Sequence, residues 1–191
     1  MNRQIFINPY EHFSERKLLL FGVSITLVGS LIAFLFNGRF DGVIDMHTAG
    51  FVKFYQPFMD NCINIVCLMI ALYPLGWFLN RKTRIIDVLN AVLISRIPFY
   101  LLPLFNFNNN LHRNGEEMLS SVTDGVKPEF GQVFAVLVFT AVAISALILF
   151  VWWLYTGFRT ATNCKKVIHK FLFAACIIFA EIVSKIIFSM I

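Results

Sequence analysis

Residues 130–155 read FGQVFAVLVFTAVAISALILFVWWLY, a run of 26 residues without a charged side chain. An α-helix needs about 20 mainly apolar residues to cross the roughly 30 Å hydrocarbon core of a bilayer. This run is long enough, and Trp152, Trp153 and Tyr155 close it with aromatic side chains that favour the membrane–water interface. The stretch therefore predicts a transmembrane helix and indicates an integral membrane protein.

The composition of the whole chain agrees with a membrane protein. Of its 191 residues, 58% are hydrophobic and only 14% are charged, whereas soluble domains average roughly 45–50% and about 25%. A soluble fold of this composition would have too few polar side chains to cover its surface, so lipid is the expected solvent. The net charge of +5 comes from short basic groups beside the apolar runs, which argues against nucleic-acid binding.

Four further apolar runs complete an all-α, polytopic transmembrane helical bundle of about five spans, in a single transmembrane domain covering residues 1–191. The predicted spans are residues 18–36, 63–79, 85–105, 130–155 and 171–191. Residues 1–17 are predicted to form a cytoplasmic amphipathic segment, with a short helix starting at Asn8-Pro9-Tyr10. Residues 51–59, also amphipathic, either lie at the outer interface or extend the second span. The polar residues 106–128 predict a loop.

Basic residues set the expected orientation, because cytoplasmic loops of membrane proteins are enriched in Lys and Arg. One side of the predicted membrane has ten of them: Arg3, Arg16, Lys17, Arg81, Lys82, Arg84, Arg159, Lys165, Lys166 and Lys170. The other side has five: Arg39, Lys53, Arg113, Lys127 and Lys185. The N-terminus is therefore expected in the cytoplasm, and five spans put the C-terminus outside.

Ionisable side chains inside a span are costly and are candidates for function. The third span contains Asp87, Asn90 and Arg96, and the fifth contains Glu181 and Lys185. Asp87 and Asn90 share a helix face, and Glu181 and Lys185 are spaced so that they can pair. Arg96 lies too far along the helix to reach Asp87, but it could meet Glu181. The functional interpretation is a polar pocket or proton path, and the structural interpretation, which we prefer, is pairing between helices.

No metal or cofactor site is predicted. The four histidines match no metal-binding spacing, and the four cysteines form no CxxC pair. Asp41, Asp45 and Asp60, together with His47, could bind a cation, but a solvated loop is the simpler interpretation. No paired carboxylates, HExxH or nucleophile motif indicates an enzyme.

The whole chain resembles the Yip domain family, membrane proteins named for interaction with Ypt/Rab GTPases, which also has bacterial members of unknown role. The resemblance rests on Asn8-Pro9-Tyr10, the five-span arrangement, the basic turn at residues 80–84, and WWLYTGFR at residues 152–159 before a closing apolar helix. The eukaryotic branch has a longer cytosolic region with its own motif, which residues 1–17 do not match. The resemblance therefore implies a non-enzymatic membrane protein that works through partners, without implying Rab binding.

Two functional hypotheses from different classes follow. The first is a bacterial inner-membrane scaffold or interaction protein of the Yip type, surrounded by the lipid bilayer and partnered by a second copy or another membrane protein. The alternative is a small transporter or channel in which Asp87, Asn90, Arg96 and Glu181 form an intramembrane polar site. A transporter requires these side chains to converge on a water-filled cavity, whereas a scaffold keeps them paired in a dry bundle.

Overall fold

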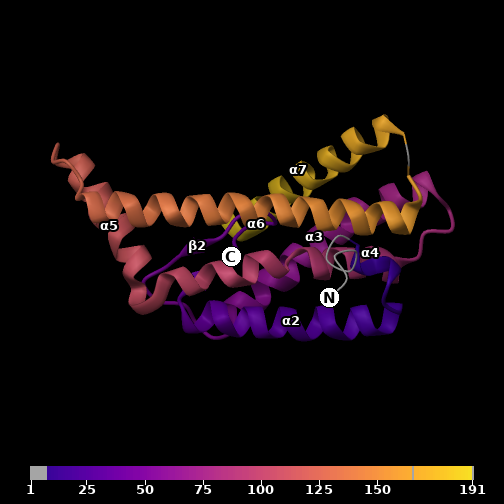
Figure 1. The fold of residues 1–191 in the computed structure, drawn as a ribbon, viewed down its shortest axis with the longest axis horizontal. Coiled ribbons are helices and arrows are strands. Elements are labelled where there is room, and N and C mark those ends of the chain that lie inside the picture. The colour runs from indigo at the N-terminus through magenta and orange to yellow at the C-terminus, as the bar shows by residue number, and fades with distance from the viewer. Residues whose placement is uncertain (1–7, 165, 191) are drawn as a thin grey trace.

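The computed structural model describes residues 8–164 and 166–190, and it consists mainly of helices (Figure 1). Its elements, in chain order, are the 3-10 helix η1 (Pro9–Glu11), α2 (Glu15–Leu35), β1 (Gly38–Arg39), β2 (His47–Thr48), α3 (Gln56–Leu79), α4 (Ile85–Ser95), the 3-10 helix η2 (Ile97–Asn109), α5 (Asn110–Thr123), α6 (Phe130–Thr162) and α7 (Val167–Ser189). Five helical runs are long and apolar enough to span a membrane: α2, α3, the run from α4 to α5, α6 and α7. The predicted all-α class with five spans is confirmed.

The helices differ from the predicted spans mainly at their ends. α3 begins at Gln56 rather than at residue 63, so part of the amphipathic stretch 51–59 extends the second span. α6 continues to Thr162, seven residues beyond the predicted exit. A helix can continue past the apolar run that predicts it, because its backbone hydrogen bonds form within the helix and do not require apolar side chains. Residues 1–7 of the predicted N-terminal segment, Lys165 and the last residue of the fifth span lie outside the described residues.

The third span is the centre of the bundle. α4 and η2 pack against α2 and α6, and α4 also packs against α3. In its most apolar window 67% of residues are buried, against 11% in α6, so the bundle encloses α6 far less than it encloses the third span. The α-helix gives way to a 3-10 helix near Arg96, because Pro98 has no N–H to continue the α-helical ladder and disfavours helical backbone before it.

Residues 106–128, predicted to be a loop, contain the helix α5. The prediction is wrong for residues 110–123, since the polar side chains there did not prevent a helix that packs on η2 and α6. Near its start, Asn106 Oδ1 accepts a hydrogen bond from the His112 N–H over 3.0 Å, which satisfies one of the free donors of a helix N-terminus. α5 lies across one end of the bundle (Figure 1).

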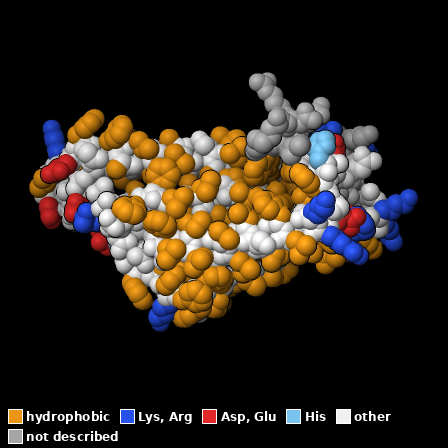
Figure 2. Space-filling model, turned by 60° about the horizontal axis from the view of Figure 1, so that its bottom comes forward, with side chains coloured by type: hydrophobic (Ala, Val, Ile, Leu, Met, Phe, Trp, Pro, Cys, Tyr) orange, Lys and Arg blue, Asp and Glu red, His pale blue; other side chains and the backbone are white. Residues whose placement is uncertain are grey.

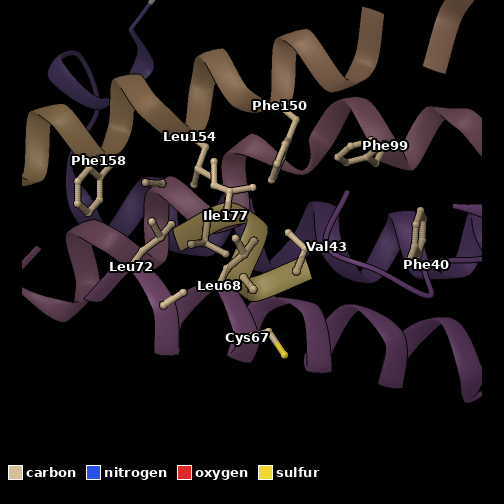
Figure 3. Packing of buried hydrophobic residues seen from close by; sticks show 14 of the residues in the cluster. Phe40, Val43, Cys67, Leu68, Leu72, Phe99, Phe150, Leu154, Phe158 and Ile177 are labelled. Carbon is tan, nitrogen blue, oxygen red and sulfur yellow. The ribbon is translucent and has the colours of Figure 1, made fainter. Parts of the chain in front are cut away.

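The apolar core joins helices that are distant in sequence. Side chains of α6 such as Phe150 and Leu154 meet Leu68 of α3 and Ile177 of α7 within one buried cluster (Figure 3). α7 packs along α3 rather than along α6, its neighbour in the chain. The last two spans meet through side chains such as Tyr155 and Phe173, whose ring centroids lie 5.4 Å apart.

A band of hydrophobic side chains covers the bundle between two ends where charged side chains gather (Figure 2). We call one the basic end, which holds the connections between α3 and α4 and between α6 and α7. The opposite end, which holds α5 and the connection between α2 and α3, is called the loop end. This distribution is the one that a bilayer around the bundle requires.

Gly29 permits the closest contact between α2 and the third span. A Cβ at this position would lie 2.3 Å from Cγ of Tyr100, near the fixed base of that ring. We predict that Gly29→Ala destabilises the protein by about 1–3 kcal/mol, because one of the two helices must move apart. Thermal unfolding in detergent measures this loss. The control is Gly131→Ala in α6, which meets nothing within 4 Å and should be neutral or slightly stabilising; equal effects at both glycines would contradict the prediction.

Candidate functional site

The connection between α2 and α3 does not stay at the surface of the bundle. Residues 38–48, called the inserted loop below, begin and end with the antiparallel pairing of β1 and β2, in which Gly38 lies opposite Thr48. Between these strands Phe40 and Val43 are fully buried, and Val43 lies within the packed core (Figure 3). Apolar side chains therefore hold a non-helical stretch of backbone inside the bundle.

The backbone of the inserted loop is paired by side chains of α3. Non-helical backbone at membrane depth is tolerated where protein groups satisfy its hydrogen bonds. The Phe40 N–H donates to Asp60 Oδ2 over 3.2 Å, and the Phe40 carbonyl accepts from Asn64 Nδ2 over 2.6 Å. Asp60 and Asn64 are both buried and lie one turn apart on α3. This polar face of α3 therefore serves the loop.

Arg96 holds the middle of the inserted loop. Its Nη1 donates to the Val43 carbonyl over 2.9 Å, and its Nη2 donates to Asn61 Oδ1 over 3.2 Å. Arg96 is 0% exposed. Arg96 follows Ile85, the first residue of α4, by eleven residues, which places it about 16 Å along the third span. This is near the middle of a roughly 30 Å hydrocarbon core. A charged group at this costly depth is thus used to bind a backbone carbonyl.

Aromatic rings and distant carboxylates surround the Arg96 guanidinium. Its Cζ lies 5.9 Å from the ring centroid of Phe40 and 6.0 Å from that of Phe99, within the range of cation–π attraction. Asp60 and Glu181 act on it electrostatically. Among the described residues Arg96 and Glu181 share no hydrogen bond or ion pair. The meeting of these two side chains that the sequence suggested is therefore an electrostatic attraction without direct contact. The Arg96 Nε has no hydrogen-bond partner in the described part of the chain.

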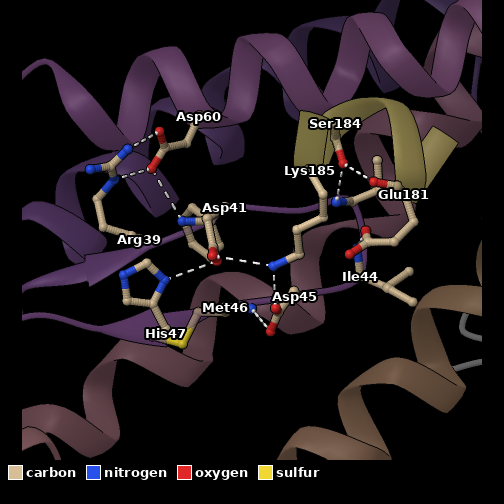
Figure 4. A network of polar contacts seen from close by, with 12 residues as sticks. Arg39, Asp41, Ile44, Asp45, Met46, His47, Asp60, Glu181, Ser184 and Lys185 are labelled. Carbon is tan, nitrogen blue, oxygen red and sulfur yellow. Dashed lines mark hydrogen bonds and ion pairs between the residues drawn. The ribbon is translucent and has the colours of Figure 1, made fainter. Parts of the chain in front are cut away.

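α7 binds the far side of the inserted loop. Glu181 Oε2 accepts from the Ile44 N–H over 3.0 Å, and Ser184 Oγ accepts from the Val43 N–H over 3.3 Å (Figure 4). Gly42 permits this approach, because a Cβ there would lie 2.6 Å from Glu181 Oε1. Glu181 therefore anchors the loop backbone to the last span.

Lys185 binds carboxylates of the inserted loop rather than Glu181, the partner considered from its spacing. Its Nζ pairs with Asp41 Oδ2 over 3.2 Å and also with Asp45, while His47 Nδ1 lies 2.9 Å from Asp41 Oδ1 (Figure 4). Burial acts to raise the pKa of Asp41, but the hydrogen bonds and charges of His47 and Lys185 outweigh it and lower the pKa to about 2. Asp41 is thus held as a carboxylate that ties the loop to α7.

The acidic residues of the loop end are paired with cations of the protein. Asp60 accepts from Arg39 at both oxygens, with Nε–Oδ2 at 2.6 Å and Nη2–Oδ1 at 2.9 Å, the two-pronged geometry that carboxylates and guanidinium groups favour. With Asp41 and Asp45 paired to Lys185, the expectation of a simply solvated loop is wrong. Within residues 8–164 and 166–190, no group of three or more His, Cys, Asp or Glu side chains could hold a metal ion.

Asp87 and Asn90 lie at the basic end, away from the inserted loop. Arg84 donates to both oxygens of Asp87 over 3.0 Å and also binds Glu15. Asn90 Nδ2 donates to the Glu15 carbonyl over 3.1 Å, which ties α2 to α4. All four residues line a cavity of about 360 Å³. The five candidate residues therefore form two separate groups, with Arg96, Glu181 and Lys185 around the inserted loop.

Sequence reasoning missed three side chains that serve the inserted loop: Asn61, Asn64 and Ser184. Asn61 and Asn64 are spaced i,i+3 and share a face of α3, and this spacing was the available signal. The predicted second span begins at residue 63, after Asn61, and the predicted loop lies outside the bundle, so this face has no partner in the prediction. A polar face on a span has no evident partner until a buried backbone segment is placed beside it.

Two segments of the family resemblance meet at the basic end. The Tyr10 hydroxyl donates to the Ala91 carbonyl over 3.5 Å, and its ring lies against Gly157, where a Cβ would be 2.7 Å from the ring. Burial raises the pKa of the Tyr10 hydroxyl. The N-terminal segment is therefore fitted into a notch between α4 and α6.

Comparison of the chain with protein-family models, with curated proteins and with solved structures finds no match. The site itself consists of hydrogen bonds to backbone and of ion pairs that position the inserted loop.

We predict that Arg96→Met destabilises the protein by about 3 kcal/mol. The Val43 carbonyl and the Asn61 amide oxygen lose their donor, and the carboxylates nearby lose a buried positive charge. Denaturant unfolding in detergent, followed by circular dichroism, measures the change. Arg113→Met on the exposed surface of α5 is the matched control and should change stability far less; a loss at Arg96 no larger than this control would refute the role given to Arg96.

Proposed function

We propose that this chain is a non-enzymatic multi-pass membrane protein of the Yip-like type, a scaffold or interaction protein in membrane organisation or trafficking. The observation that carries the proposal is the use made of the deep polar side chains. Arg96, Asn64 and Glu181 each bind backbone of the inserted loop. Side chains committed to holding the fold favour a structural role over transport or catalysis.

The surface of α6 supports a role that depends on partners. This helix spans 33 residues, about 50 Å at 1.5 Å per residue, and only 11% of its most apolar window is buried in the bundle. Ile148 and Trp152, both more than half exposed, belong to this surface. Lipid covers such a surface in the simplest case, and a second copy or another membrane protein is the partner that a scaffold requires.

The proposed location is a bacterial inner membrane, with the N-terminus in the cytoplasm and the C-terminus outside. α2 starts at the basic end and α7 ends toward the loop end. The basic connections Arg81 to Arg84 and Arg159 to Lys170 both belong to the basic end. The excess of Lys and Arg there supports the assignment of this end to the cytoplasm.

A transporter or channel remains a second candidate, because of one observation. The third span changes from an α-helix to a 3-10 helix near Arg96, and broken helices near the middle of a membrane are typical of transporter binding sites. The cavity beside Asp87 and Asn90 is not lined by Arg96 or Glu181. The two functions differ in whether water reaches Arg96.

Cysteine labelling distinguishes the two functions and tests the orientation. In a variant whose four cysteines are replaced by alanine, Ser95→Cys introduces a thiol beside Arg96 at a fully buried position. We predict that a membrane-impermeant maleimide does not label it in intact or permeabilised bacterial cells, because a dry bundle excludes the reagent. Labelling of this thiol would favour the transporter.

The controls for this labelling are Ser120→Cys on α5 and Lys82→Cys at the basic end, both exposed. Ser120→Cys should react in intact cells, and Lys82→Cys should react only after permeabilisation. The opposite pattern would show that the orientation is reversed.

The scaffold proposal also predicts a protein contact on α6. A photo-crosslinking residue at Ile148, which is 64% exposed, should give a discrete protein adduct in native membranes. The control places the same photo-crosslinking residue at position 20 of α2, where Leu20 is 70% exposed. It should give lipid adducts alone if partners bind through α6. The absence of any protein adduct at both positions would count against a scaffold.

A further inference from the structure

We propose that a groove at the basic end binds the headgroup of an ethanolamine phospholipid, with its phosphate at Arg159 and Lys170 and its ammonium at Glu11. The groove has a volume of about 630 Å³ and lies between the N-terminal segment, the last turns of α6 and the start of α7. This proposal is independent of the scaffold role, since it concerns a lipid ligand and a different part of the chain.

The two cations of the groove are available to a ligand. Among the described residues, neither Arg159 nor Lys170 forms an ion pair, and the Lys170 ammonium lies 6.0 Å from the ring centroid of Tyr155. Arg84 at the same end differs, because its guanidinium is occupied by Glu15 and Asp87. Phosphate oxygens are the acceptors that suit free Arg and Lys side chains.

The depth of the groove matches that of a lipid headgroup. Trp152 and Tyr155, which line it, are the residue types that favour the membrane–water interface. Arg159 follows Trp152 by seven residues, about 10 Å farther along α6 toward the basic end. The groove thus runs from the aromatic belt toward the cytoplasmic side proposed above, where the phosphates of that leaflet lie.

Asn8 provides a second, independent indication of a ligand. It lines the groove, and its amide oxygen is buried without a hydrogen-bond partner in the described part of the chain. A buried polar atom normally has a partner, and one that lacks it calls for an explanation such as a ligand. The ammonium of the headgroup could donate to this oxygen.

Glu11 explains why the ligand should be zwitterionic. This carboxylate lines the same groove and forms no ion pair among the described residues, so two cations and one anion face the space. A phosphodiester with one negative charge and a primary ammonium with three N–H donors matches this set. A glycerol headgroup or inorganic phosphate would leave Glu11 without a cation, and a choline headgroup has no N–H to donate.

The test measures lipid binding to the purified full chain in detergent by native mass spectrometry. Phosphatidylethanolamine, phosphatidylglycerol, phosphatidylcholine and inorganic phosphate are added separately. We expect phosphatidylethanolamine to bind most tightly and inorganic phosphate not to bind. Tighter binding of phosphatidylglycerol, or binding of inorganic phosphate alone with similar affinity, would overturn the proposal.

Variants locate the site. Arg159→Gln combined with Lys170→Gln should weaken binding of phosphatidylethanolamine by about tenfold or more, since each basic residue near a lipid surface contributes roughly fivefold. The matched control, Arg16→Gln with Lys17→Gln, removes the same charges from the start of α2 and should retain affinity. If both double variants weakened lipid binding equally, the general positive charge of the surface would explain the effect, and the proposal would be overturned.

The remaining variants test the ammonium contact and guard against misfolding. Glu11→Gln should retain binding but lose the preference for phosphatidylethanolamine over phosphatidylglycerol, and an unchanged preference would refute the role of Glu11. Circular dichroism checks that each variant is folded. If the double variant fails this check, Lys170→Gln alone replaces it and should weaken binding about fivefold; unchanged affinity in this variant would overturn the proposal.

Discussion

The hydrogen bond from Arg96 to the Val43 carbonyl meets the main physical constraint on this bundle, the pairing of buried backbone groups. Backbone groups removed from water must be paired, and the inserted loop is not a helix that pairs its own groups. Side chains from three spans therefore supply the partners: Asn64 from α3, Arg96 at the start of η2 and Glu181 from α7. The polar residues of these spans and the buried loop depend on one another.

The same requirement explains why the five spans are unequal. The third span lies in the centre because it carries Arg96 to the loop, and its change to a 3-10 helix at Pro98 lies beside this contact. Gly29 lets α2 approach Tyr100 of the same span closely. α6, in contrast, holds no buried charge, and few residues of its most apolar window are buried within the bundle.

Charges at the two ends of the bundle are used differently. At the loop end, Asp41, Asp45 and Asp60 are paired with Lys185 and Arg39, so the charges stabilise the fold. At the basic end, some cations are paired within the protein, whereas Arg159 and Lys170 face a groove without an ion-pair partner in the described chain. The proposed lipid contact uses this difference, and the proposed scaffold role uses the apolar surface between the ends.

The sequence by itself determined the number of spans and their approximate limits, because hydropathy and helix length are local properties that lipid imposes on each segment separately. It also identified Arg96, Glu181 and Lys185 as unusual, since a charge in an apolar run is costly wherever it lies. It did not predict helix α5, where polar side chains obscured a helical backbone, and it left open whether residues 51–59 extend the second span, as α3 does from Gln56. Only the tertiary structure decided the partners, separating Asp87 and Asn90 from the other three, bringing Asn64 and Ser184 to the inserted loop and Asn61 to Arg96. The reason is physical: hydrogen bonds between segments as far apart as Val43 and Ser184 depend on how helices pack, which no local pattern encodes.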